Sequence, residues 1–459
     1  MQELGEDTGA GDEATAVSQE LLKGVEAALE AGDDEALHGL VGDLHEADLA
    51  DLMELLRPDE RTELINRLGA DFEFATLSEL DETVRDQVVE AMPNEQVAEA
   101  VRELESDDAV YLLENLEEGE KSDILSRVPK GERAQLERSL AYPEDSAGRL
   151  MRTEFIAVPP FWTVGQAIDY MRETDDLPDS FSELYVIDPA VHLLGEVALA
   201  RLLRTKRPVA IEEIMERDLK TVAVTLDQEE VARLFERYDL YSAPVVDEDA
   251  RLVGVVTVDD VVEVIQEEAE EDIKRLGGVG DESIADTVLR IAGRRFPWLL
   301  VNLATSLLAS AVISAFDATI EQMVALAVLM PIVASMGGNA GTQTMTIAVR
   351  ALATRELSIV NARRIISREV IVGMLNGLMF ALIMGVVTYL WFGSGGLGLV
   401  IAAAMVINLL VAGLFGIIIP MTLEHYDIDP AIASSVFVTT VTDVVGFFAF
   451  LGIAAVWLV

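Results

Sequence analysis

The 459-residue sequence contains no cysteine, which excludes disulfides and thiolate metal sites and permits a reducing compartment. Histidine is scarce, with four in the chain, and no catalytic histidine pair, Ser-His-Asp grouping or Walker motif is apparent. An enzyme acting on nucleotides is therefore the less favoured alternative. Basic residues are few, since 33 Lys and Arg face 81 Asp and Glu. We expect no nucleic-acid partner, because a phosphate backbone requires a basic surface.

The acidic charge lies almost entirely in the first 295 residues, which hold 73 of the 81 acidic residues and 28 of the 33 basic ones. The remainder of the chain is apolar and nearly neutral. Residues 1–20 lack the basic and apolar regions of a signal peptide, and we predict a disordered acidic tail there. The composition indicates an acidic soluble half joined to a membrane half.

Five apolar segments follow Arg295, each near or above the length of about 20 residues that crosses the hydrocarbon core. They cover residues 296–315, 323–352, 365–392, 397–423 and 430–459. All five arginines of this half lie within residues 350–368, in or beside the connection between the second and third segments, and three more precede the first. The lengths predict five crossings of the cytoplasmic membrane, in which the segments contact lipid. The positive-inside rule predicts a cytosolic N-terminus and an external C-terminus.

The acidic half shows two kinds of periodicity. Residues 21–142 carry leucines three and four apart between short breaks, which predicts an all-α superhelical domain of short helix pairs. A repeat follows: LMRTEFIAVPPFWTVGQAIDYM matches IMERDLKTVAVTLDQEEVARLF at an offset of 64, and LYVIDPAVHLLGEVALARLL matches APVVDEDARLVGVVTVDDVV at 59. Each copy alternates strands and helices. The predicted parts are 143–206 and 207–265 for the copies, 266–292 for a connecting helix and 293–459 for the membrane domain.

The two copies resemble a CBS pair, an α/β regulatory module. The second copy has Gly254, Thr257 and Asp260 in a G-x-x-T-x-x-D arrangement, which in CBS modules places a hydroxyl near phosphate and a carboxylate near ribose. The first copy has Ala198 and Arg201 instead of the last two. The resemblance implies an adenine nucleotide such as ATP at Thr257 and Asp260. The alternative is an ordinary strand-to-helix cap by Thr257.

A run of carboxylates begins near the end of the second copy. Like charges at i and i+4, such as Glu263 with Glu267, destabilise a helix unless cations lie between them. A solvated helix face and a divalent-cation site against a facing acidic surface are both open interpretations. The carboxylates of this run are Asp259, Asp260, Glu263, Glu267, Glu268, Glu270, Glu271 and Asp272.

The second apolar segment contains PIVASMGGNAGTQT at residues 331–344, a polar and glycine-rich stretch at bilayer depth. We expect a broken helix there, because irregular backbone inside a membrane is tolerated where it lines a watery cavity, and such breaks mark ion sites. Gly337, Gly338 and Gly341 would free backbone carbonyls, and Asn339 offers an amide oxygen. Close helix packing through small residues is the alternative.

Asp443 is the only ionisable side chain of the fifth segment and lies about midway along it. A buried carboxylate at that depth costs at least a few kcal/mol unless a cation, a proton or water meets it. No arginine or lysine lies in the interior of any segment, so a mobile cation is the favoured partner, and a protonated Asp443 bonded to a neighbouring helix is the alternative. Thr439, Thr440 and Thr442 add hydroxyls.

The order of these parts, with P-I-V-A-S-M-G-G-N-A-G-T-Q in the second segment and T-D-V-V-G in the fifth, closely resembles the MgtE family of magnesium channels after about residue 20. The resemblance implies a homodimer with a pore on its twofold axis, formed by the second and fifth segments. Asp443 would hold Mg²⁺ there with Asn339 nearby. The remaining implied pore residues are Gly338, Thr439 and Thr440.

The same resemblance implies a cytosolic gate, in which Mg²⁺ bound among the acidic domains and the connecting "plug" helix holds the closed state. The regulatory ligands that it implies are Asp259, Asp260, Glu263, Glu267, Glu268, Glu271 and Asp272, with Asp227 and Glu230 from the second copy. The expected function is passive Mg²⁺ uptake. A secondary active transporter that couples divalent cations to H⁺ or Na⁺ is the alternative.

Overall fold

The computed structural model describes residues 17–174, 177–178, 180–279, 288–358, 360–426 and 428–458, and only the backbone at 432–434. Most of the predicted acidic tail (1–20) and part of the predicted connecting helix (266–292) therefore lie outside the described residues. The chain divides into two compact units, Met1–Glu268 and Ala269–Val459.

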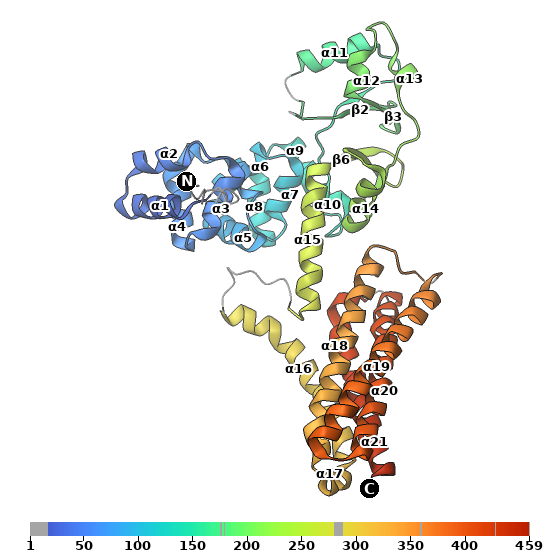
Figure 1. Ribbon diagram of the computed structural model, residues 1–459. Helices are drawn as coiled ribbons and strands as arrows, with labels where there is room; N and C mark the ends of the chain where they lie inside the picture. The colour runs from blue at the N-terminus through green and yellow to red at the C-terminus, as the bar shows by residue number, and fades with distance from the viewer. Residues whose placement is uncertain are drawn as a thin grey trace, which may run out of the picture. The chain divides into compact units, whose positions relative to one another are not determined.

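The first unit begins with short α-helices (Figure 1). They are α1 (Gln19–Ala31), α2 (Asp34–Val41), α3 (Glu46–Leu55), α4 (Pro58–Leu68), α5 (Glu82–Ala91), α6 (Asn94–Glu103), α7 (Ser106–Leu113), α8 (Glu118–Arg127) and α9 (Lys130–Ser139), with 3₁₀ turns η1 (Gly69–Asp71) and η2 (Phe74–Leu77). Polar caps start several of them: Ser18, Asp33 and Asp81 each accept a backbone N–H from the first turn that follows. The predicted all-α domain is confirmed.

Two three-stranded sheets form the repeat. In each, a parallel pair is extended by an antiparallel strand, in the orders β1-β2-β3 and β4-β5-β6. The elements are α10 (Ala147–Leu150), β1 (Ala157–Val158), α11 (Val164–Glu173), β2 (Glu183–Ile187), β3 (Leu193–Ala198), α12 (Leu199–Arg204), α13 (Ile211–Ile214), β4 (Val222–Ala223), α14 (Gln228–Tyr238), β5 (Ser242–Val246) and β6 (Leu252–Thr257). Helix α14 begins 64 residues after α11, and β5 begins 59 after β2, which are the offsets that the sequence predicted.

The segment that leads into each copy forms an antiparallel bridge with the sheet of the other copy. Arg152 pairs with Val255 on β6, through N–H···O bonds of 2.8 and 2.9 Å. In the same way Glu216 pairs with Glu196 on β3, through bonds of 3.0 and 2.8 Å. The exchange joins the two copies into one body. Helix α15 (Val258–Leu276) then continues directly from β6.

Glu196 offers a test of this exchange. Burial, with Glu183 and Glu216 nearby, raises the pKa of Glu196 to about 7. Since the folded pKa lies above the unfolded one, the folded state favours the protonated acid, and this stabilisation is lost as pH rises from about 4.5 through 7. Glu196→Gln is expected to stabilise the protein by about 1–3 kcal/mol above pH 7, with the gain vanishing near pH 5. Denaturant unfolding at several pH values measures it, with the exposed Glu212→Gln as control.

The second unit contains the apolar helices (Figure 1). They are α16 (Val288–Ser314), the short α17 (Asp317–Gln322), α18 (Ala325–Ala353), α19 (Ala362–Phe392), α20 (Gly395–His425) and α21 (Pro430–Trp457). Among the described residues five are long and apolar enough to cross a membrane, as the sequence predicted. Helix α20 is central, since it packs against α18, α19 and α21.

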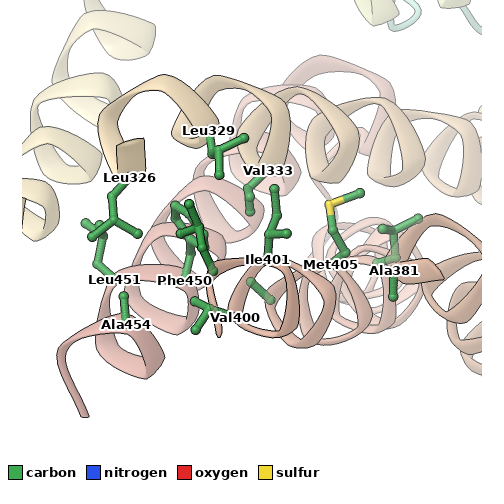
Figure 2. Packing of buried hydrophobic residues seen from close by; sticks show 13 residues of the cluster. Leu326, Leu329, Val333, Ala381, Val400, Ile401, Met405, Phe450, Leu451 and Ala454 are labelled. Carbon is green, nitrogen blue, oxygen red and sulfur yellow. The ribbon is translucent and has the colours of Figure 1, made fainter. Parts of the chain in front are cut away.

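The core of this unit lies where α18, α20 and α21 meet (Figure 2). Leu329 and Val333 of α18 pack against Ile401 and Met405 of α20. Phe450 of α21 joins them, and all five side chains are fully buried. These contacts hold α18 and α21, the two predicted pore helices, against the same helix, α20.

The expected break in the second segment is wrong. Helix α18 runs without interruption through Pro331 and all three glycines of PIVASMGGNAGTQT. The glycines serve close packing instead: a Cβ on Gly341 would lie 2.5 Å from Cγ1 of Val438 on α21, and one on Gly337 would overlap the amide of Asn408 on α20. The small residues therefore let two neighbouring helices approach the α18 backbone.

Candidate functional site

The polar residues of α18 gather on its exposed side. This stripe follows a helical spacing of three and four and comprises Ser335, Asn339, Thr342, Gln343 and Thr346. The packed side carries Val333, Gly337, Gly341 and Met345, all buried. A polar stripe facing lipid would be costly, so its exposure in a single chain points to water or to another polar surface.

Asp443 lies on α21 with its carboxylate half-buried, and the described residues provide it with no hydrogen bond or ion pair. Thr439 and Thr440 share its face of the helix. Their hydroxyls donate to carbonyls one turn earlier, at 2.9 Å from Ser435 and 2.6 Å from Val436, which leaves hydroxyl oxygens free to accept or coordinate. The site therefore offers a carboxylate and neutral oxygens, the ligand types that Mg²⁺ prefers.

The structure brings Gly338 and Thr439 together, because a Cβ on Gly338 would lie 3.7 Å from Cγ2 of Thr439. Two predicted site residues from α18 and α21 thus meet at a helix contact. Asn339, the next residue of α18, is exposed, and its Nδ2 lies 3.5 Å from Ser335 Oγ.

Asn408 is a residue that the sequence reasoning missed. Its fully buried amide donates from Nδ2 to the Val333 carbonyl at 2.8 Å, while the described residues leave its Oδ1 without a partner. The amide fills the space that Gly337 and Gly446 leave by having no side chain. A Cβ on Gly446 would lie 2.7 Å from Asn408 Nδ2. A polar residue within the apolar fourth segment was the available signal.

Gly337→Ala is expected to destabilise the membrane unit by about 1–3 kcal/mol, because the added methyl overlaps the Asn408 amide. Adding Asn408→Ala should restore much of this loss by vacating the space. Thermal unfolding in detergent measures both, with Gly395→Ala, which meets nothing within 4 Å, as control. Equal losses in the single and double variants would contradict the packing.

Carboxylates of the first unit surround a cavity of about 130 Å³ between α7 and α15, which we call the acidic pocket. Its acidic residues are Asp107, Asp108, Glu114, Asp145, Asp260, Glu263 and Glu267. Burial, and to a smaller degree the charge of Asp260, raises the pKa of Asp108 to about 6 and that of Glu263 to about 7. Desolvation also raises the pKa of Glu114 to about 7. Burial is the larger cause of these shifts and repulsion from neighbouring carboxylates adds to it, so a bound cation would favour the charged forms.

The predicted regulatory residues fall into two groups. Asp260, Glu263 and Glu267 line the acidic pocket, and Glu268 accepts a hydrogen bond from Gln228 at its edge, at 2.9 Å. The others have different partners: Asp227 caps α14, Glu230 pairs with Arg233, Asp259 pairs with Arg152, and Glu271 pairs with Arg275. Asp272 lies on α15.

Arg275 also pairs with Asp429, whose carboxylate caps the first turn of α21. The end of α15 is thus tied to the start of the helix that carries Asp443.

The pocket residues Asp107, Asp108, Glu114 and Asp145 were not predicted, although the adjacent acidic pair at 107–108 was a visible signal. In the described part of the chain, no three Asp, Glu or His side chains converge closely enough to hold a metal ion as they stand.

A second cavity, of about 240 Å³, lies between the two copies of the repeat. Tyr185, Ser242 and Thr257 line it, and the Tyr185 and Ser242 hydroxyls are 2.8 Å apart. Of the two predicted nucleotide residues only Thr257 lines this cavity. Its hydroxyl donates to Asp260 Oδ2 at 2.6 Å, and Asp260 turns toward the acidic pocket.

Three family models match the chain: MgtE, a divalent cation transporter, over residues 330–453, the MgtE intracellular N domain over 44–145, and the CBS domain over 147–206 and 211–267. A Bacillus subtilis protein named magnesium transporter MgtE is 31% identical over 407 residues, 88% of each chain. A Thermus thermophilus protein of that name is 32% identical over 456 residues, 95% of this chain and 98% of the relative. A solved cytosolic domain of the Mg²⁺ channel MgtE in complex with ATP shares 31% identity at a TM-score of 0.49, covering 53% of this chain and 99% of that one.

Proposed function

Because the chain belongs to the MgtE family of magnesium transporters, we propose that it is a magnesium-selective channel through which Mg²⁺ passes down its gradient into the cell. The observation that carries this proposal is Asp443, a carboxylate in a membrane helix for which the described residues provide no cation. A permeating Mg²⁺ would supply the missing charge.

The pore is formed by two copies of the chain, with the polar stripe of α18 and the Asp443 face of α21 turned toward the twofold axis. Twofold symmetry makes one aspartate per chain into a facing pair. Asp443 and Asn339 would hold a largely hydrated ion, since Mg²⁺ sheds water reluctantly and prefers octahedral oxygen. Gly338, Thr439 and Thr440 complete the path.

Cytosolic Mg²⁺ closes the channel by binding at the acidic pocket. The pocket's repelling carboxylates support this role, because a bound cation favours the arrangement in which they are close together. Glu263 and Glu267 are its principal ligands on α15, with Asp108 facing them from α7. Because α15 is tied to α21 through Arg275 and Asp429, a change in α15 reaches the pore helix.

The remaining parts of the proposal are the orientation of the chain in the membrane and its division into domains. The N-terminus is cytosolic and the C-terminus external, and the parts are a tail (1–20), a helical domain (21–142), two CBS copies (143–206 and 207–265), a plug segment (266–292) and the membrane domain (293–459). ATP binds in the cavity between the CBS copies, with Thr257 as a phosphate contact, and the hydroxyls that line this cavity support the assignment.

Reconstitution in liposomes tests the function. Purified protein should admit Mg²⁺ to a trapped magnesium dye in proportion to the Mg²⁺ gradient and the membrane potential, with no requirement for H⁺ or Na⁺ gradients. Protein-free liposomes set the leak. Uptake that stops when the H⁺ or Na⁺ gradient is collapsed would establish the secondary transporter instead.

A further inference from the structure

The guanidinium of Arg152 lies among four carboxylates and is 14% exposed. Its Nε donates to Asp107 Oδ2 at 2.8 Å, and its Nη1 pairs with Glu105. On the other side, its Nη2 donates to Asp259 Oδ2 at 2.8 Å and to Asp260 Oδ1 at 3.0 Å. The first two carboxylates belong to the start of α7 and the other two to the start of α15, so a single cation joins the helical domain to the second CBS copy.

The backbone around Arg152 is fixed as well. Its N–H and C=O pair with Val255 of β6. The next residue, Thr153, donates its N–H to Ser106 Oγ at 2.7 Å, and Glu154 accepts from the Ser106 hydroxyl, also at 2.7 Å. Ser106 is the first residue of α7. The arginine is therefore held in place by strand pairing and by direct bonds to the helix that carries its partners.

This arrangement does not fit a magnesium site at Asp259 and Asp260. Their oxygens already accept charge-assisted hydrogen bonds from a mostly buried guanidinium that stays protonated. A Mg²⁺ ion binding there would have to displace the guanidinium from these two carboxylates or lie beside its mostly buried positive charge, and either is costly. Although desolvation opposes it, the nearby carboxylates of Asp107 and Asp260 raise the pKa of Arg152 above its ordinary value.

We propose that Arg152 is a built-in cation that holds the helical domain on the second CBS copy without Mg²⁺, and that Asp259 and Asp260 are not magnesium ligands. Resting on the function proposed above, this assigns the regulatory ion to the far side of the acidic pocket, at Glu263 and Glu267. The contact that responds to Mg²⁺ then lies along α15, and the junction at Arg152 stays closed.

Disulfide trapping reads this junction directly, since the chain has no cysteine of its own. Ser106 Oγ and Thr153 Oγ1 lie 3.1 Å apart, so the pair Ser106→Cys and Thr153→Cys places two thiols across the junction. The full-length double variant in detergent is treated with a mild oxidant, and the rate of crosslinking is measured in EDTA and in saturating Mg²⁺.

With Arg152 present, we expect the same crosslinking rate in EDTA and in Mg²⁺. Adding Arg152→Gln should slow the rate in EDTA by about tenfold or more, because four carboxylates then face one another without a cation. Arg207→Gln, which removes an exposed pair with Asp169 on the first CBS copy, is the matched control and should change nothing. A wild-type junction that needs Mg²⁺, or an Arg152→Gln junction that crosslinks at the normal rate in EDTA, would overturn the proposal.

A rescue variant separates this outcome from misfolding. Adding Glu105→Gln and Asp259→Asn to Arg152→Gln removes two of the repelling charges and should return the EDTA crosslinking rate toward normal. An unfolded protein would not regain it, and failure to regain it in a folded protein would contradict the charge argument. Crosslinking does not depend on ion flux, so the outcome stands apart from the transport test.

Discussion

Asp443→Ala is expected to reduce Mg²⁺ flux into liposomes by at least about tenfold, while the protein stays folded. The carboxylate is the one negative charge of α21. Without it, nothing on this helix offsets the cost of bringing a divalent ion into the hydrocarbon depth, and neutral hydroxyls at Thr439 and Thr440 are weaker ligands for a hard cation. Asp443→Asn, which keeps the size and loses the charge, should be almost as impaired.

The control is Asp317→Asn, which removes an exposed carboxylate from the short α17 and should leave flux unchanged. Flux is compared at equal protein incorporation, and thermal unfolding in detergent verifies the fold of each variant. Asp443→Ala flux at the wild-type level would make the carboxylate structural and would move the search for the ion site to Asn339 and the polar stripe of α18.

The broad architecture was predictable because it depends on local periodicity. Apolar lengths predicted the five long helices, and the repeat offsets of 64 and 59 predicted two similar sheets. Asp443 stood out because a lone charge in an apolar helix is costly in any fold. Each of these features is visible within one segment of the chain.

The features that were mispredicted depend on distant neighbours. Glycines in α18 suggested a break, yet their role is set by Asn408 and Val438, which lie far along the chain on α20 and α21. Arg152, which the sequence analysis did not single out, also depends on a distant partner, since it is 107 residues from Asp259. A run of carboxylates shows that cations are needed, but the fold decides whether a side chain or an ion supplies the charge.

Neutralising the acidic pocket is expected to leave the channel open at Mg²⁺ concentrations that close the wild type. In the variant Asp108→Asn with Glu263→Gln and Glu267→Gln, the pocket has lost the carboxylates that an ion would bridge between α7 and α15. Mg²⁺ then stabilises the closed form less, and the half-closing concentration should rise by about tenfold or more. Flux is measured while Mg²⁺ on the cytosolic side is raised.

Glu212→Gln with Glu213→Gln on α13 provides a control of similar charge change, because both residues are exposed and lie outside the acidic pocket. Closure in this control should match the wild type, which excludes a general effect of lowering the negative charge. If the pocket variant also closes normally, the pocket carries no regulatory ion. If it stays open while Asp443→Ala conducts nothing, the two carboxylate sites have separate tasks, with one passing Mg²⁺ and the other sensing it.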